Sequence, residues 1–466
     1  MTMDTEVDPT IVVEQNSVAR VRGLEQSALR GTYWVVIFYS LSMALRLGGS
    51  IVLTRLFMPQ YFGLMTLVTT VIVGMNLFSH VGLPDSIIQN PRGEEPVFLN
   101  TAWTLQVIRG AGLCLLTIPL AWPVARFYHE PQIIPLLPLL GVGCLIAGFS
   151  SPSLLLLSRH LGVGRLSALE LLTQFVQFAV TWIWALFQPT IWALIAGRLI
   201  SEACRSGISY LLLPDVGPRF TWDRESVRVL IKFGRWILIG TALTFLALQS
   251  DRLILAKLIS LQMLGVYGIA FSLSDIPRQI ILMFCSRVGF PFIAKFSHQP
   301  RTTFRKILLK YRFPVLAVGG VMLIAVICVG DLFILRVFPK PYHDAAWMVP
   351  ILALGLWHTL LYNTISPAIL SLQKAHYNAF AYLVYCISLY ILLPWGFHVM
   401  GMVGAVIAVA FSDLPVYFVN VYSASREGIA TLNQDLLLTL SFLGSLAVAL
   451  WARSWLGFGF PFPAKI

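Results

Sequence analysis

Charged residues are scarce in this chain. Only 12% of its 466 residues are Asp, Glu, Lys or Arg, while 57% are hydrophobic. An average soluble protein has about 25% charged and roughly 45–50% apolar residues. A soluble protein of this length needs a charged surface that 33 basic and 21 acidic residues cannot supply. The composition excludes a soluble enzyme, a disordered protein and a fibrous protein, and it indicates an all-α polytopic membrane protein.

Sequence motifs for chemistry are absent as well. The chain has no GxxxxGK[ST] loop, no GxSxG and no HExxH, which argues against an ATPase, a serine hydrolase or a zinc protease. Its six cysteines lie in apolar stretches without CxxC spacing, and its eight histidines are scattered. We therefore predict no enzymatic activity, no cofactor and no metal site. The N-terminus lacks the pattern of a cleavable signal peptide and indicates a polar tail with a short interfacial helix over about residues 14–30.

Long apolar stretches are what the chain has instead. Thirteen of them approach the roughly 20 residues that a membrane-spanning helix requires. They are 32–56, 63–83, 100–122, 134–157, 167–187, 191–213, 234–256, 263–285, 313–335, 345–370, 378–397, 402–422 and 435–452. We predict a cytoplasmic tail (1–31), a six-helix bundle (32–213), a cytoplasmic linker (214–233), a second six-helix bundle (234–422) and an additional C-terminal helix with a tail (423–466). The total is 12 to 14 transmembrane helices.

The placement of Lys and Arg predicts the orientation. With the N-terminus in the cytoplasm, 20 basic residues fall in cytoplasmic segments and 6 in outer connections, Arg312 being counted with the first set and Arg453 with the second. Cytoplasmic loops of membrane proteins are enriched in basic residues. The net charge of +12 is therefore a topology signal and does not indicate a nucleic-acid partner. The outer connections are too short to form a separate catalytic domain.

A short internal repeat relates the two halves. Residues 53–64 align without gaps to residues 255–266, at an offset of 202, with four identical positions that include Gly63 and Gly265. Both segments join the first and second span of a half. Six spans per half give both halves the same sense in the membrane, so the duplication is parallel. Two parallel bundles with a substrate between them are typical of an alternating-access carrier.

Three segments resemble polysaccharide exporters. IVLTRLFMPQYFGLMTLV (51–68) is similar to that family's R-L-L-x-P-x-D-F-G-L signature, and VGLPDSIIQN (81–90) to x-G-L-x-x-A-L-I-Q. QSDRLILAKLISLQMLGVYGIAFSLSDIP (249–277) resembles the family's N-x-D-x-x-x-x-G-x-x-x-G-x-x-x-L-G-x-Y. Gln60 and Tyr61 stand where the family commonly has an acidic and an aromatic residue, and Lys257 replaces a usual small residue. The resemblance is to the polysaccharide transporter (Wzx-like) branch of the multidrug/oligosaccharidyl-lipid/polysaccharide superfamily, with a MATE-like fold.

This resemblance implies a function. A member would be a multi-pass protein of the bacterial inner membrane that moves a polyprenyl-diphosphate-linked oligosaccharide from the inner to the outer leaflet. Its partners would be that substrate, membrane lipids and a polysaccharide polymerase or export complex. The pathway would be exopolysaccharide, O-antigen or capsule biosynthesis.

Charged residues inside the predicted spans are the candidate site, because such residues are costly in a bilayer and usually face a cavity. The predicted contacts to an anionic headgroup are Arg46, Arg109, Arg198, Arg205, Arg252 and Arg278. Arginine suits phosphate because its planar group stays ionised and binds two oxygens at once. The acids that would couple an ion or pair structurally are Glu170, Glu202, Asp251, Asp275 and Asp413.

Helical spacing separates these residues further. Arg198, Glu202 and Arg205 share one helix face, and Asp275 lies one turn before Arg278, so internal ion pairing is the alternative for both groups. Arg46 and Arg109 have no acid within four residues on their own helices and are the stronger candidates for substrate contact. Asp251 and Arg252 point about 100° apart on a helix and need not pair.

The segment 286–312 carries seven basic residues and no acid. Attraction to anionic lipid headgroups explains it under the positive-inside rule. The alternative is a cytoplasmic entrance for diphosphate headgroups.

Three other functions compete with the flippase. A lipid II flippase would share the chemistry, and only the resemblance opposes it. An exporter of organic cations would line its cavity with carboxylates and aromatic residues, whereas Arg outnumbers acids in these spans. A membrane glycan polymerase or ligase would be expected to have a long outer loop.

Overall fold

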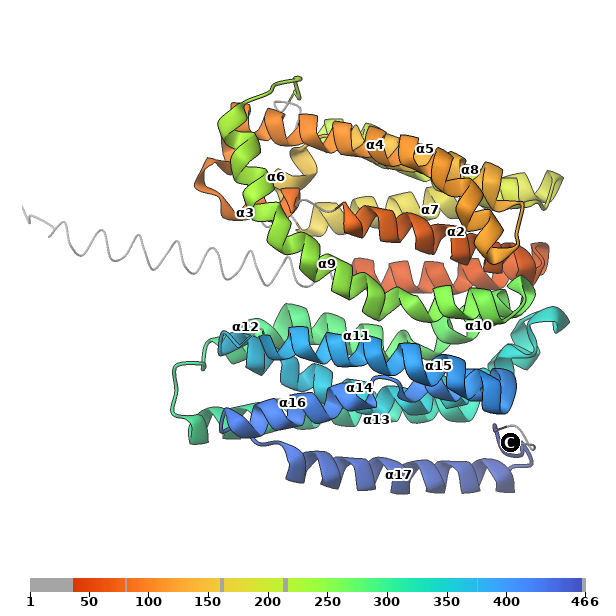
Figure 1. Cartoon of the computed structure of the whole chain (residues 1–466). Coiled ribbons are helices and arrows are strands. Elements are labelled where there is room, and N and C mark those ends of the chain that lie inside the picture. The colour runs from red at the N-terminus through yellow and green to blue at the C-terminus, as the bar shows by residue number, and fades with distance from the viewer. Residues whose placement is uncertain (1–36, 80–81, 160–162, 213–216, 375, 463–466) are drawn as a thin grey trace, which may run out of the picture.

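The chain folds into two helical lobes. A computed structural model describes residues 37–79, 82–159, 163–212, 217–374 and 376–462, and no strand occurs in these ranges. The predicted tail (1–31) and interfacial helix lie outside them. One lobe holds the helix Ile37–Leu56, α2 (Pro59–Phe78), α3 (Leu83–Gln89), α4 (Pro96–Tyr128), α5 (Ile133–Gly148), α6 (Ser153–Arg159), α7 (Val163–Phe187) and α8 (Ile191–Leu212). Figure 1 shows this lobe above the other.

The second lobe contains the remaining described helices. It comprises α9 (Arg224–Leu258), α10 (Leu261–Ser274), α11 (Ile276–Phe284), a π-helical turn (Cys285–Gly289), α12 (Phe290–Ala294), α13 (Arg301–Val337), α14 (Ala345–Ser371), α15 (His376–Phe411), α16 (Leu414–Arg426) and α17 (Leu432–Trp455). Helix α9 runs along the boundary between the lobes, and α17 lies on the side of the second lobe that faces away from the first (Figure 1).

The thirteen predicted spans, where the structure describes them, fall mainly on helices. Within the described residues, nine helices are long and apolar enough to cross a membrane, or ten if α5 and α6, bent by 64°, form one span. Helices α8 and α9 do not count among these, and both carry several charged residues. Gly401, with a φ of 61°, divides the stretch His376–Arg426 into two. The predicted all-α polytopic fold is confirmed, although α9 begins at Arg224 and not near residue 234.

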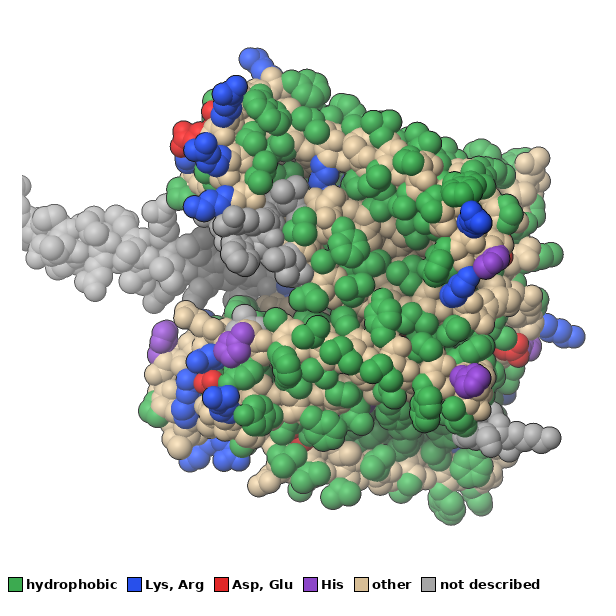
Figure 2. All heavy atoms as spheres, in the orientation of Figure 1, with side chains coloured by type: hydrophobic (Ala, Val, Ile, Leu, Met, Phe, Trp, Pro, Cys, Tyr) green, Lys and Arg blue, Asp and Glu red, His purple; other side chains and the backbone are tan. Residues whose placement is uncertain are grey.

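The surface matches a membrane environment. A broad band of hydrophobic side chains covers the visible face between the two ends, and most of the visible Lys and Arg side chains gather at the left end (Figure 2). Large apolar side chains of the helices are exposed, for example Leu440 at 71% and Trp451 at 69% on α17. Soluble proteins avoid such extended apolar surfaces. We call the left end, where α9 and α13 begin, the basic end.

Two buried ion pairs hold α17 against α13. The Arg312 guanidinium donates to the Asp435 carboxylate at 2.7 Å, and both side chains are fully buried. At the other end of the same helices, Arg453 donates to Asp331 at 2.8 Å. The helix rise places Arg312 and Asp331 about 28 Å apart on α13, close to the roughly 30 Å of a hydrocarbon core. One pair therefore lies near each membrane surface.

These pairs correct two sequence-based assignments. Arg312 was expected in a cytoplasmic connection, within the basic segment 286–312, and Arg453 in an outer connection. Both are buried and paired instead, because each has a carboxylate on a helix more than 120 residues away in the chain. Arg312 also donates to Thr364 at 2.9 Å. The basic residues of the predicted cytoplasmic segments still outnumber those of the outer connections, since each of the two sets loses one residue.

Removal of one partner from the first pair should destabilise the protein. In Asp435→Ala, the Arg312 guanidinium stays buried without its carboxylate, which typically costs about 3–5 kcal/mol. Thermal unfolding of the purified protein in detergent should show a clearly lowered midpoint. The control is Glu427→Ala, which removes the long contacts to the half-exposed Arg301 at 4.0 Å and Lys374 at 3.9 Å and to the Tyr377 hydroxyl at 3.5 Å, and it should cost far less than Asp435→Ala. The double variant Arg312→Met/Asp435→Leu should recover most of the loss. Equal midpoints for Asp435→Ala and the wild type would contradict a structural role for the pair.

Candidate functional site

The two lobes meet in a close helix contact at the end opposite to the basic end. There α2 packs on α10, and the contact depends on Gly63 and Gly265. A Cβ atom on Gly63 would overlap the backbone carbonyl of Leu261, and one on Gly265 would overlap that of Pro59. The two contacts are symmetric under the offset of 202 residues. The repeated glycines of the two halves thus meet at the axis that relates them, and we call this contact the glycine seam.

Hydrogen bonds between the lobes reinforce this end. The Tyr342 hydroxyl donates to the Phe57 carbonyl at 2.9 Å in a buried position, and the Tyr128 hydroxyl donates to the Leu253 carbonyl at 3.3 Å. Each of these residues lies at the end of its helix or loop that is remote from the starts of α9 and α13. The protein is therefore tied shut on this side of the membrane.

A cavity in the first lobe holds two of the predicted arginines. It has a volume of about 410 Å³ and is lined by the helix Ile37–Leu56, α2, α7 and α8. Arg46 and Arg198 line it together with the amides of Gln174 and Gln177. Arg198 also contacts Glu202 at 3.3 Å, so the expected internal pairing is present. Its side chain is nevertheless 46% exposed, which leaves its guanidinium accessible to a ligand.

A second cavity lies directly inside the glycine seam. It has a volume of about 330 Å³ and is bounded by α2 on one side and by α9 and α10 on the other. Arg252 lines this cavity. Its guanidinium carbon lies over the Phe271 ring, 5.6 Å from the ring centroid. The guanidinium also donates a hydrogen bond to the Gln249 side-chain oxygen at 2.9 Å. Threonine hydroxyls of α2, including Thr66, line the opposite wall. This cavity offers one cation among neutral hydrogen-bonding groups.

Acidic side chains gather in a smaller cavity of the second lobe. Its volume is about 70 Å³, and Asp251, Asp275 and Asp413 line it together with Arg278. Asp275 binds Arg278 through both carboxylate oxygens, the Nη2–Oδ2 distance being 2.9 Å. The expected pairing of these two residues is therefore present. Asp251 accepts a hydrogen bond from the buried Tyr267 hydroxyl at 2.8 Å and does not pair with Arg252.

Asp413 is the centre of a buried polar cluster. Its carboxylate lies 2.5 Å from His358 Nε2 and accepts hydrogen bonds from Thr359 at 2.7 Å and Tyr362 at 3.1 Å. The sequence reasoning named Asp413 but missed these partners on α14. Positions 358, 359 and 362 share one helix face, so three polar residues with this spacing in an apolar span were the available signal.

One contact connects the first lobe to the acidic cluster. Arg46 donates to the Gln279 amide oxygen at 3.4 Å, and Gln279 donates to Asp275 at 3.0 Å. The chain Arg46–Gln279–Asp275–Arg278 therefore crosses from one lobe to the other. A change in the charge at either end alters the electrostatic environment of the other.

Four of the predicted residues, namely Arg109, Arg205, Glu170 and Glu202, line none of these three cavities, and Glu202 is the partner of Arg198 described above. Arg109 donates to the Asn76 carbonyl at 2.6 Å and to the Ser79 hydroxyl at 3.0 Å, at the C-terminal end of α2. A cation is favourable there, because the last carbonyls of a helix are unpaired. Arg205 and Glu170 are exposed side chains of α8 and α7. Groups of three or more metal-ligating side chains do not occur in the described residues.

Comparison with known proteins assigns the family. A family model described as "Polysaccharide biosynthesis protein" matches residues 52–347. The chain belongs to this family. Curated relatives include the amylovoran biosynthesis protein AmsL of Erwinia amylovora (27% identical over 55% of this chain and 66% of AmsL) and the lipopolysaccharide biosynthesis protein WzxC of Escherichia coli (23%, 71% and 66%). A third is the teichuronic acid biosynthesis protein TuaB of Bacillus subtilis (24%, 64% and 62%). The alignments thus span slightly less than two thirds of these relatives.

Solved structures share the fold. The lipid II flippase MurJ in an inward closed conformation superposes with a TM-score of 0.69 at 12% identity, covering 89% of this chain and 91% of MurJ. An inward-facing multidrug transporter of the MATE family of the MOP superfamily gives 0.63 at 13% identity, covering 84% and 98%. The predicted MATE-like pair of bundles is confirmed.

A side chain at the glycine seam should open the closed side. In Gly63→Val, the valine would force α2 away from the Leu261 carbonyl, because backbone atoms cannot give way as a flexible side chain can. The reporter is Ser272→Cys, an exposed position in the cavity inside the seam, in a protein with its six cysteines replaced. A membrane-impermeant thiol reagent added from the seam side should label the reporter several-fold faster in Gly63→Val. Gly265→Val should do the same.

The matched control is Gly444→Val on α17, where a Cβ atom meets nothing within 4 Å. This variant should leave the labelling rate at the wild-type value. Slow labelling in both seam variants, with monodisperse protein, would show that the glycines do not control access.

Proposed function

We propose that this protein is a flippase for polyprenyl-diphosphate-linked oligosaccharides in the inner membrane of a bacterium. It has no catalytic role of its own, and it supplies repeat units for exopolysaccharide, O-antigen or capsule biosynthesis. The basic end faces the cytoplasm, as does the N-terminus. The names of the relatives support the pathway, since each is a biosynthesis protein for a surface polysaccharide.

One observation carries this proposal: arginines line a cavity of the first lobe and the adjacent cavity between the lobes. Arg46, Arg198 and Arg252 line two adjacent cavities that share Phe62 and lie on the basic side of the glycine seam. A diphosphate bears two or more negative charges, and arginine binds phosphate oxygens in a bidentate manner. Glutamine and threonine side chains in the same walls supply donors and acceptors for sugar hydroxyls.

Alternating access follows from this arrangement. The closed seam on one side and the cavities on the other describe a state in which the substrate enters from the cytoplasmic leaflet. Separation of α2 from α10, with closure at the basic end, would then expose the same arginines to the outer side. The polyprenyl tail stays in the bilayer while the headgroup crosses.

The acidic cluster of the second lobe is our proposed coupling site. Asp413 and His358 form a hydrogen-bonded pair of ionisable residues inside the membrane, where such residues mark ion pathways. Asp275 connects to the first-lobe cavity through Gln279 and Arg46. Proton binding at this cluster would alter the charge seen by Arg46, which couples ion movement to release of the anionic headgroup.

The alternatives fit the cavities less well. An organic cation would be repelled by Arg46, Arg198 and Arg252. A lipid II flippase shares the fold with this chain, but the curated relatives that cover most of the chain act in surface polysaccharide biosynthesis. A polymerase or ligase would need reactive groups in an accessible domain, and the connections between the described helices are short.

Loss of the cavity arginines should stop export. In a strain without the chromosomal gene, Arg46→Ala and Arg198→Ala should each lower surface polysaccharide at least tenfold, with lipid-linked repeat units retained on the cytoplasmic side. Arg→Lys at the same positions should recover part of the activity, because charge remains and bidentate binding is lost. The control is Arg126→Ala in the last turn of α4, remote from the cavities. Full export by both alanine variants at normal protein levels would contradict the assignment.

Neutralisation of Asp413 should separate transport from the proton gradient. In Asp413→Asn, export should fall at least tenfold, because the carboxylate can no longer take up and release a proton. An uncoupler should inhibit the wild type and leave the residual export of this variant unchanged. Continued inhibition of the variant by the uncoupler would place the coupling group elsewhere.

A further inference from the structure

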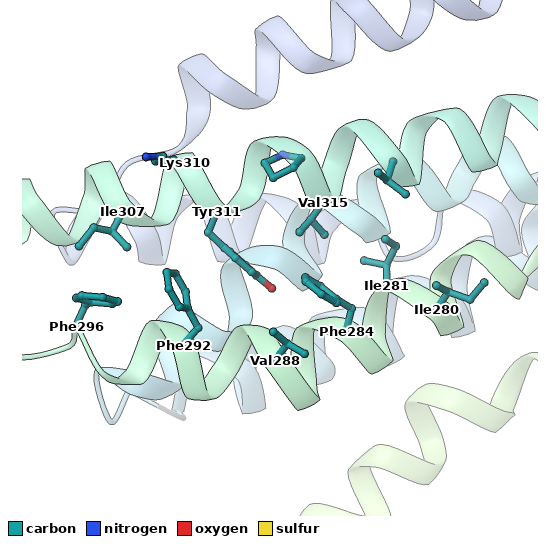
Figure 3. A pocket seen from close by; sticks show the side chains of 12 residues that line it. Ile280, Ile281, Phe284, Val288, Phe292, Phe296, Ile307, Lys310, Tyr311 and Val315 are labelled. Atoms are coloured by element: carbon teal, nitrogen blue, oxygen red, sulfur yellow. The ribbon is translucent and has the colours of Figure 1, made fainter. Parts of the chain in front are cut away.

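An apolar groove runs along the second lobe, outside the cavities described above. It has a volume of about 730 Å³, within the range of about 300–1,000 Å³ that small-molecule sites occupy. Its walls are α11, the π-helical turn and α12 on one side and the first half of α13 on the other (Figure 3). Lys310 is the single charged residue among the side chains that line it.

The π-helical turn shapes this groove. Such turns insert an extra residue into a helix and occur frequently at functional sites. Here the turn brings Gly289 beneath Tyr311, and a Cβ atom on Gly289 would overlap the Tyr311 hydroxyl. The Tyr311 ring can therefore lie in the groove, parallel to Phe284 at 6.3 Å and 5.9 Å from Phe292. These rings form a continuous apolar floor.

The protein leaves this floor uncovered. Phe284, Val288 and Phe292 are 39%, 38% and 41% exposed. In a membrane, exposed apolar side chains contact lipid chains, and the concave shape of this surface suits a single apolar chain. Along α13, the lining residues run from Ile307 to Val318, a rise of about 16 Å, or roughly half of a 30 Å hydrocarbon core. The groove thus has the length of one leaflet.

The basic residues along the groove indicate which end of a bound ligand carries negative charge. Lys310 lies at the edge of the groove, and Lys306 and Arg287 are exposed close by in sequence on the same two walls. Lys306 and Lys310 are on the half of the groove nearer the basic end, Arg287 is near its middle, and Pro314, Val315 and Val318 line the deeper half. The matching ligand is a long single apolar chain that ends in a strongly anionic group.

We propose that this groove binds the polyprenyl chain of the lipid-linked substrate, with its diphosphate next to Lys310. This inference rests on the proposed function and names the site for the tail of that substrate. Ile280 and Ile281 line the groove, and the residues directly before them, Arg278 and Gln279, belong to the contacts of the central cavities. One helix therefore holds the tail on one face and meets the headgroup cavity with another. A chain held there presents its headgroup to the cavity entrance before it crosses.

Binding of undecaprenyl phosphate to the purified full-length protein tests the proposal. Native mass spectrometry in detergent should show one bound lipid, retained against an equal concentration of phosphatidylglycerol. Val288→Trp and Val318→Trp fill the groove and should each weaken binding at least fivefold. Val321→Trp is the matched control, because Val321 is 68% exposed on the same helix and does not line the groove. Lys310→Glu should weaken binding of the phosphate and spare that of undecaprenol.

Two results would overturn the inference. One is wild-type affinity in both groove variants, with normal thermal stability. The other is displacement of undecaprenyl phosphate by phosphatidylglycerol at equal concentration, which would make the groove a general phospholipid site. Surface polysaccharide is measured separately in the same strains. If the groove variants show both normal export and normal lipid binding, the groove is not the tail site, and the flippase function stands. If lipid binding depends on the groove but the wild type exports no polysaccharide, the groove is a lipid site, and the flippase function is wrong.

Discussion

The close approach of α2 and α10 is the constraint on which the other features of this structure depend. Two backbones can meet only where no Cβ atom intervenes, and Gly63 and Gly265 provide that condition on both sides of the contact. The contact fixes which side of the membrane is closed. It also places the arginine-lined cavities directly behind it, so that their access must come from the basic end. Because the two glycines are repeat equivalents, the seam lies at the axis of the duplication.

Charges inside the bilayer then divide into two kinds according to their partners. Arg312 and Arg453 are paired with buried carboxylates and hold α17 to α13. Arg46, Arg198 and Arg252 have weaker or neutral partners and face open volume. A buried ion pair has no remaining capacity for a ligand, whereas a cavity arginine with an amide partner does. This difference, and not the number of charges, indicates which residues meet the substrate.

The sequence predicted the fold well and the site in part, for physical reasons. Spans and the repeat are local patterns, so the all-α pair of bundles and the equivalence of Gly63 and Gly265 could be anticipated from apolar runs and a fixed offset. The contact between the two glycines is a tertiary feature and was not predicted. The pairing of Asp275 with Arg278 is also local, at one helical turn. Arg312–Asp435 and His358–Asp413 join helices far apart in the chain, and no local pattern contains that information. Arg312 was consequently assigned to a surface segment, and the partners of Asp413 were missed.

The central claim is that the cavity between the lobes carries an anionic lipid-linked cargo across the bilayer. The most direct measurement uses liposomes that contain only this protein, with a fluorescent polyprenyl-diphosphate oligosaccharide in one leaflet and a membrane-impermeant quencher outside. The account expects transfer of the labelled lipid between leaflets at a rate well above that of empty liposomes, and no accelerated transport of an organic cation such as ethidium. Transport of ethidium without transfer of the lipid would contradict it.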